Sequence, residues 1–277
     1  MTKLDQAKRK GIYLLPNLFT TGAMFAGYYA IIASIQGKFS MACLSIFIAA
    51  LLDGLDGRVA RLTNTQSEFG EQYDSLSDLV SFGVAPSLLA FNWSLYSLTD
   101  VHPILGKLGW LAAFIFAVSG ALRLARFNTQ IGVIDKAYFQ GLPSPAAAAV
   151  LAGFIWVCVD MGLQGADLRY IMLPLTAIVG LLMVSRFRYY SFKTIPFKEG
   201  VSFVWLIILV LIIVLLAIKT EWVLFIVFSL YAASGVVMTL LHIKNKRASK
   251  KNKSTKNEPQ TIESNPDDDK KEKTDEV

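Results

Sequence analysis

The chain reads Asp53-Gly54-Leu55-Asp56-Gly57-Arg58-Val59-Ala60-Arg61 near the end of one long apolar stretch, and Gly70, Asp74 and Asp78 follow at the start of the next. Residues three, four and seven apart share one face of a helix. The aspartates of the first stretch therefore share a face of one helix, as Gly70, Asp74 and Asp78 do on the next. Carboxylates at membrane depth are costly, so four together require a cation or a reaction. We predict that two antiparallel helices bring the four aspartates into one functional site.

A turn separates these two helices. The segment Thr65-Gln66-Ser67-Glu68 fits a capping box, in which a hydroxyl and an acidic side chain close the first turn of a helix. The second helix is therefore predicted to begin here, with Thr65 as its cap.

The composition predicts a membrane protein. Of 277 residues, 54% are hydrophobic, which is high for a soluble domain. A helix needs about 20 apolar residues to cross a bilayer, and eight segments approach that length. They are residues 15–36, 39–62, 72–98, 106–127, 143–162, 168–186, 202–219 and 221–243. We predict an all-α integral membrane protein of about eight transmembrane helices.

The positive charges predict the orientation of these helices. The connections on one side hold four lysines and arginines with their flanks, and those on the other side hold thirteen before the C-terminal tail. Cytoplasmic loops carry the excess of lysine and arginine. Both termini and the aspartates are therefore predicted to be cytoplasmic, around a cavity that opens to the cytoplasm.

The chain is predicted to contain one membrane domain, residues 1–243, and a charged tail, residues 244–277. The tail has no aromatic residue and is rich in lysine, asparagine and acidic residues, a composition typical of disorder. Its basic first part would lie against anionic headgroups. The net charge of +6 therefore reflects the loops and the tail, and nucleic acid is not an expected partner.

Four clustered carboxylates predict a metal site. They repel one another unless a cation neutralises them, and oxygen ligands select Mg²⁺, Mn²⁺ or Ca²⁺ over zinc. Two such ions can clamp a pyrophosphate and stabilise charge on a leaving phosphate. Small residues such as Gly57, Ala60 and Gly70 let a ligand approach the backbone, and Arg61 adds a positive charge. Helix capping can explain a single aspartate, and helix packing can explain the small residues, but neither requires four aspartates.

The pattern Asp53-x₂-Asp56-Gly57-x₂-Ala60-Arg61-x₈-Gly70-x₃-Asp74-x₃-Asp78 resembles the signature of the CDP-alcohol phosphatidyltransferase family at every position. The resemblance implies that the four aspartates hold two divalent ions, Mg²⁺ or Mn²⁺, with Ca²⁺ a further candidate. It implies that Asp78 deprotonates the incoming alcohol, whose oxygen attacks the phosphorus of a CDP-lipid and expels CMP. It also implies that the site for the cytidine nucleotide is lined by Gly57, Ala60, Arg61 and Gly70.

Longer blocks indicate which alcohol is used. The signature is shared by enzymes that use glycerol phosphate, inositol phosphate, choline-type acceptors and serine. The blocks 66–86, 123–128 and 139–146 resemble the bacterial family members that use L-serine. This resemblance implies CDP-diacylglycerol and L-serine as substrates, membrane phospholipids as surroundings, the bacterial inner membrane as location, and a homodimer. A sister transferase that uses glycerol 3-phosphate or another alcohol is the alternative.

A serine acceptor carries a carboxylate, so its site needs a cation. Arg123 and Arg126 could hold that carboxylate or the lipid phosphate, and positive-inside anchoring explains them equally well. The same two interpretations apply to Arg186, Arg188 and Lys193, where anchoring is favoured.

Two polar residues border a turn before the fifth apolar segment. Gln140 and Ser144 flank Gly-Leu-Pro, a composition that often marks only a helix start. Contact between these side chains and a substrate is a weaker hypothesis.

A cation transporter is an alternative from a different functional class. Such a protein carries polar residues through the depth of the bilayer on several helices. Here the acids gather at one side, and the outer halves of the apolar segments are almost uncharged. The sequence therefore favours a transferase.

Overall fold

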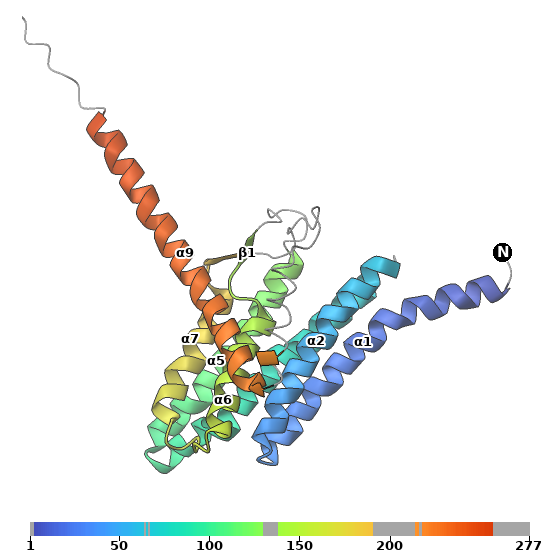
Figure 1. Cartoon of the computed structure of the whole chain (residues 1–277), viewed down its shortest axis with the longest axis horizontal. Coiled ribbons are helices and arrows are strands. Elements are labelled where there is room, and N and C mark those ends of the chain that lie inside the picture. The colour runs from blue at the N-terminus through green and yellow to red at the C-terminus, as the bar shows by residue number, and fades with distance from the viewer. Residues whose placement is uncertain are drawn as a thin grey trace, which may run out of the picture. The chain divides into compact units, whose positions relative to one another are not determined.

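A computed structural model describes residues 3–63, 65, 67–129, 138–190, 214–215 and 218–256. Helices make up most of this part of the chain, and the other regular element is a small sheet of two strands (Figure 1). The elements are α1 (Lys3–Ile35), α2 (Phe39–Thr63), α3 (Glu68–Asp78), η1 (Leu79–Val84), α4 (Ala85–Trp93), η2 (Leu95–Asp100), α5 (Pro103–Thr129), β1 (Tyr138–Gln140), α6 (Ser144–Asp160), α7 (Arg169–Val184), β2 (Arg188–Tyr190) and α9 (Thr220–Lys256).

Four helical segments of the described chain are long and apolar enough to cross a membrane. They are Pro16–Ile35, Phe39–Thr63, Pro103–Thr129 and Thr220–Thr239. The helices α6 and α7 are apolar but shorter. The expected span at 202–219 lies mostly outside the described residues. The helical membrane-type fold is therefore confirmed, while the number of eight spans stays a prediction.

The third predicted span is a composite. The run from 68 to 93 is helical throughout, but it changes from α3 through the π-helical turn η1 to α4. Pro86 has no N–H to give to the carbonyl of Phe82, and the Ala85 N–H bonds to the carbonyl of Val80 instead. The sequence missed this change of winding, which begins directly after Asp78.

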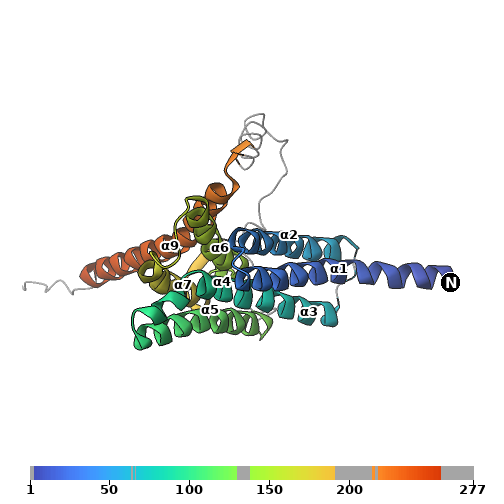
Figure 2. The same cartoon turned by 90° about the horizontal axis from the view of Figure 1, so that it is seen from below.

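Small residues allow α1 to pack closely against its neighbours. A Cβ on Gly27 would lie 2.7 Å from Cα of Ser81 in η1, and the Ser81 hydroxyl donates to the carbonyl of Ala23 at 3.1 Å. Ala30 and Ala33 of the same helix are buried. Helices in lipid associate through such close backbone contacts. Figure 2 shows the result, with α1 between α2 and α3.

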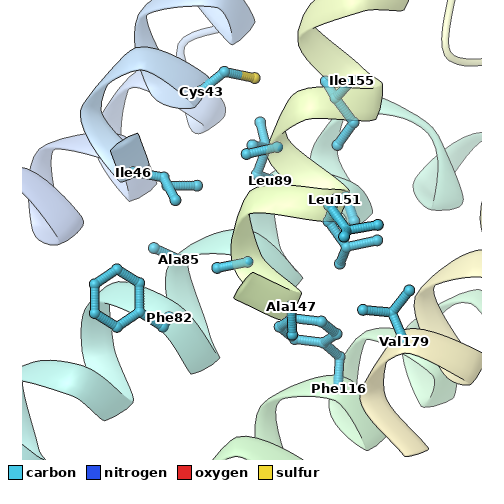
Figure 3. Close-up of a cluster of buried hydrophobic side chains, with 14 of the residues drawn as sticks. Cys43, Ile46, Phe82, Ala85, Leu89, Phe116, Ala147, Leu151, Ile155 and Val179 are labelled. Carbon is cyan, nitrogen blue, oxygen red and sulfur yellow. The ribbon is translucent and has the colours of Figure 1, made fainter. Parts of the chain in front are cut away.

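The core surrounds α6. Its Ala147, Leu151 and Ile155 are buried, and Figure 3 shows them facing side chains such as Leu89 of α4 and Phe116 of α5. The buried cluster consists mainly of aliphatic and aromatic groups, with a few sulfur-containing side chains such as Cys43, and such groups gain dispersion energy from dense packing. The core therefore holds α2, α4 and α5 in place beneath the polar site.

The strands β1 and β2 pair antiparallel, with Gln140 opposite Arg188. No strand was predicted here, because three residues are too few for an alternating pattern to show. Gly141 follows with φ +82°, and a Cβ there would lie 2.1 Å from the carbonyl oxygen of Met183. Only glycine fits this turn, which connects Gln140 at the end of β1 to the start of α6 at Ser144.

The helix α9 continues to Lys256, although the sequence predicted disorder from residue 244. Lysine, alanine and arginine are good helix formers, and adding turns to an existing helix costs little. Contacts divide the chain into two units, Met1–Met238 and Thr239–Val277, and the site described below lies in the first. The predicted domain boundary at residue 243 stays a prediction, and residues 257–277 lie outside the described residues.

Candidate active site

The side chains of the four aspartates, two from α2 and two from α3, lie together beside α1. One carboxylate oxygen from each of Asp53, Asp56 and Asp74 lies within 4.8 Å of the others. Asp78 is not part of that tight group, but its carboxyl lies within hydrogen-bonding reach of Asp53, and Asp56 lies within reach of Asp74. The helical spacing thus produces the convergence expected from the sequence.

Two oxygens of this cluster have no partner. Asp74 Oδ1 and Asp78 Oδ1 are buried without a hydrogen bond among the described residues. A buried carboxylate oxygen is costly unless it is paired or binds a metal. The donor set consists only of carboxylates, the ligands that hard divalent cations prefer. The residues present therefore fit Mg²⁺, Mn²⁺ or Ca²⁺.

Ser67, rather than Thr65, caps α3. Its Oγ accepts a hydrogen bond from the Gly70 N–H at 3.1 Å, and the helix begins at Glu68. Thr65 instead hydrogen-bonds to the Thr63 hydroxyl at 2.7 Å. The predicted capping box was therefore wrong about the cap, because the hydroxyl of Thr65 is already engaged. A Cβ on Gly70 would lie 3.1 Å from Ser67 Oγ, so glycine also keeps this cap open.

A cavity of about 390 Å³ borders the cluster. Three of the aspartates line it, together with all four residues expected to contact a nucleotide: Gly57, Ala60, Arg61 and Gly70. A Cβ on Gly57 would meet no atom within 4 Å, so this position opens directly into free space.

Two helices contribute lining residues that the sequence did not predict. Pro16, Asn17 and Thr20 come from α1, and Phe127 and Asn128 are among those from α5. The Asn128 amide donates to the hydroxyl of Ser75 on α3 at 3.0 Å and so closes one wall. The only signal for the α1 group in the sequence is the presence of polar residues early in an apolar segment.

The two arginines of α5 contact the two polar residues of the following turn. Arg123 donates to the Ser144 hydroxyl at 3.0 Å, and Arg126 donates to the side-chain oxygen of Gln140. Arg123 also interacts electrostatically with Asp78. Its Nε is buried without a partner among the described residues. Arg123 therefore lies at the edge of the cluster with a free donor.

The remaining cationic candidates lie elsewhere. Arg186 is exposed just before β2, and Arg188 lies within β2 opposite Gln140. Neither is among the described residues that line the cavity. Lys193 lies outside the described residues.

Known proteins share this pattern over most of the chain. The family model described as CDP-alcohol phosphatidyltransferase matches residues 13–182. A Helicobacter pylori protein named CDP-diacylglycerol–serine O-phosphatidyltransferase is 36% identical over 239 residues, which is 86% of this chain and 98% of that protein. Proteins of the same name from Bacillus subtilis and Methanocaldococcus jannaschii are 33% and 38% identical. The alignment with the Bacillus subtilis protein covers 65% of this chain and 91% of that protein. The alignment with the Methanocaldococcus jannaschii protein covers 57% of this chain and 66% of that protein.

Proposed function

The chain belongs to the CDP-alcohol phosphatidyltransferase family, and we propose that it transfers the phosphatidyl group of CDP-diacylglycerol to L-serine, giving phosphatidylserine and CMP. The observation that carries this proposal is the group of aspartates at a cavity lined by Gly57, Ala60, Arg61 and Gly70. The names of the relatives support serine as the acceptor. Family membership favours this reaction over cation transport.

The aspartates are proposed to hold two divalent ions, Mg²⁺ or Mn²⁺. The three converging oxygens and the unpartnered oxygens of Asp74 and Asp78 support this assignment. When bound, such ions neutralise the carboxylates and stabilise the negative charge of the pyrophosphate. The lining glycines leave room for the nucleotide, and Arg61 places a fixed positive charge beside its phosphates.

Asp78 is proposed to accept the proton of the serine hydroxyl. The serine oxygen then forms a bond to the phosphorus of the phosphatidyl group, and the bond from that phosphorus to the oxygen shared with CMP breaks. CMP leaves with the electron pair of that bond. Asp78 lines the cavity and has one carboxylate oxygen without a partner among the described residues, as a base that must meet a substrate requires.

Arg123 is proposed to bind the carboxylate of serine. It interacts electrostatically with Asp78, so one serine molecule could present its hydroxyl to Asp78 and its carboxylate to Arg123. Its buried Nε has no described partner, and arginine forms strong paired hydrogen bonds with carboxylates. Arg126 is engaged by Gln140, and we assign Arg126, Arg186 and Arg188 to anchoring at the cytoplasmic interface.

We propose a location in the bacterial inner membrane, which the bacterial relatives support, and the charge bias supports a site that faces the cytoplasm. A cytoplasmic site would meet serine and release CMP in the compartment that holds both. The homodimer implied by the family resemblance stays a prediction.

The acceptor is tested by a panel of alcohols. Purified protein receives CDP-diacylglycerol, Mn²⁺ and one of L-serine, ethanolamine or glycerol 3-phosphate, and CMP release is measured. We expect strong stimulation by L-serine and little by ethanolamine, which lacks the carboxylate that Arg123 would bind. CMP release that glycerol 3-phosphate stimulates and serine does not would contradict the serine assignment and favour the sister transferase.

A further inference from the structure

One threonine of α1 touches both helices of the aspartate cluster. The Thr20 hydroxyl donates to Asp56 Oδ2 at 2.8 Å. The Thr20 carbonyl accepts a hydrogen bond from the Ser77 hydroxyl at 3.1 Å, and Ser77 lies between Asp74 and Asp78 on α3. Thr20 is 4% exposed and Asp56 is 5% exposed, so this bond is largely shielded from water.

The Thr20 hydroxyl has one preferred acceptor. Its single hydrogen has two acceptors within reach, Asp56 Oδ2 at 2.8 Å and the Pro16 carbonyl at 3.2 Å. The shorter contact goes to the acceptor that carries charge, and charge-assisted bonds are the stronger ones. Threonine is also β-branched, which limits its side-chain rotamers in a helix. The hydroxyl is therefore held toward Asp56 before any ligand binds.

The bond from Thr20 orients the Asp56 carboxylate and still leaves it able to accept further hydrogen bonds or metal contacts. An ionised carboxylate can accept about four hydrogen bonds or metal contacts, and Thr20 takes one. Further acceptor positions remain on this side chain, which has an oxygen within 4.8 Å of oxygens of Asp53 and Asp74. The carbonyl contact to Ser77 sets the position of α3 from the same residue. Thr20 thus fixes ligands on α2 and α3 relative to each other.

We propose that Thr20 is a positioning residue for the divalent-metal site, acting through Asp56. The inference rests on the proposed function of the aspartates as metal ligands. Thr20 lies 33 positions before the first aspartate of the signature pattern and is not part of it. Partners of this kind orient metal ligands, and their loss typically weakens metal affinity about 10- to 100-fold.

The test measures Mn²⁺ binding by the full chain in detergent, without nucleotide or lipid, from the electron paramagnetic resonance signal of free Mn²⁺. Thr20→Val removes the hydroxyl and keeps the shape. We expect its Kd for Mn²⁺ to rise about 10- to 100-fold. Thr20→Ser keeps the hydroxyl but gains rotamer freedom, so its Kd should stay within about threefold of wild type.

Thr21→Val is the matched control. Thr21 follows Thr20 on α1, and its hydroxyl hydrogen-bonds to the Tyr73 hydroxyl of α3 at 2.9 Å. Among the described residues, this hydroxyl has no hydrogen bond to an aspartate. Its removal breaks a contact between α1 and α3 and should leave Mn²⁺ binding unchanged. Equal weakening in Thr20→Val and Thr21→Val would overturn the proposal, because general packing of α1 would then explain both.

Other outcomes are equally decisive. Wild-type affinity in folded Thr20→Val, or equal loss in Thr20→Val and Thr20→Ser, would overturn the role of the hydroxyl and leave the metal site standing. If the wild-type chain binds no Mn²⁺, the proposed metal site fails as well. Should Thr20→Val not fold, Thr20→Ala makes the same comparison, since it removes the hydroxyl without adding a methyl group.

Discussion

Asp78→Asn is expected to abolish almost all Mn²⁺-dependent CMP release while the protein stays folded. A positioned general base contributes about 10²–10⁴-fold to a rate, and an amide cannot take the proton of the serine hydroxyl. The change preserves the shape of the side chain. It also removes one of four acids that repel one another, so the thermal midpoint should be unchanged or higher. The assay measures CMP release and thermal unfolding on the same preparation.

Glu68→Gln is the control for this variant. Glu68 is an exposed acid in the first turn of the same helix, and it is not among the described residues that line the cavity. The control removes an equal charge from α3 and should retain activity. Full activity in Asp78→Asn would rule out Asp78 as the base.

Gly57→Leu is expected to block nucleotide binding. The added side chain would enter the cavity, because a Cβ at Gly57 meets no protein atom within 4 Å. Overfilling a site costs about 1–3 kcal/mol, so the affinity for CMP should fall about 5- to 150-fold. Replacing glycine inside a helix favours helix formation by about 0.8 kcal/mol, so the fold should not suffer. Equilibrium binding of labelled CMP to the purified variant measures the effect.

Gly54→Leu is the control that distinguishes an effect on the cavity from an effect on the helix. Gly54 lies one turn earlier in α2, and its Cβ would also meet no atom within 4 Å, but it is not among the described lining residues. This variant gains the same helix propensity and should bind CMP normally. Unchanged CMP affinity in Gly57→Leu, or equal loss in both variants, would contradict a nucleotide site at Gly57.

The convergence of the aspartates could be predicted because it depends on local geometry. A helix repeats every 3.6 residues, so the spacing of Asp53 and Asp56, and of Asp74 and Asp78, determines which faces they share. The short turn after α2 then lets α2 and α3 both pack against α1, which brings the two faces together. The cavity residues Gly57 and Arg61 follow from the same periodicity, since they lie four and eight residues after Asp53, toward its side of α2.

The contacts that complete the site could not be predicted, because they join residues far apart in sequence. Thr20 meets Asp56 across 36 positions, and nothing in an apolar helix marks one threonine as a partner of an acid. The bond from Arg123 to Ser144 depends on the turn at Gly141, whose positive φ angle is visible only in the structure. The cap at Ser67 was missed because Thr65 and Ser67 both carry a hydroxyl that could cap α3. The hydroxyl of Thr65 is hydrogen-bonded to Thr63, and Ser67 accepts the bond from the Gly70 N–H.

The central claim is that this chain joins serine to the lipid half of CDP-diacylglycerol, and one measurement tests it directly. Purified protein with Mn²⁺, CDP-diacylglycerol and radiolabelled L-serine is assayed for label in extracted lipid and for CMP in the aqueous phase. We predict labelled phosphatidylserine and CMP in equal amounts, and neither product in significant amount when CDP-diacylglycerol is omitted. CMP released without label in the lipid, or lipid labelled without CDP-diacylglycerol, would contradict the proposed transfer.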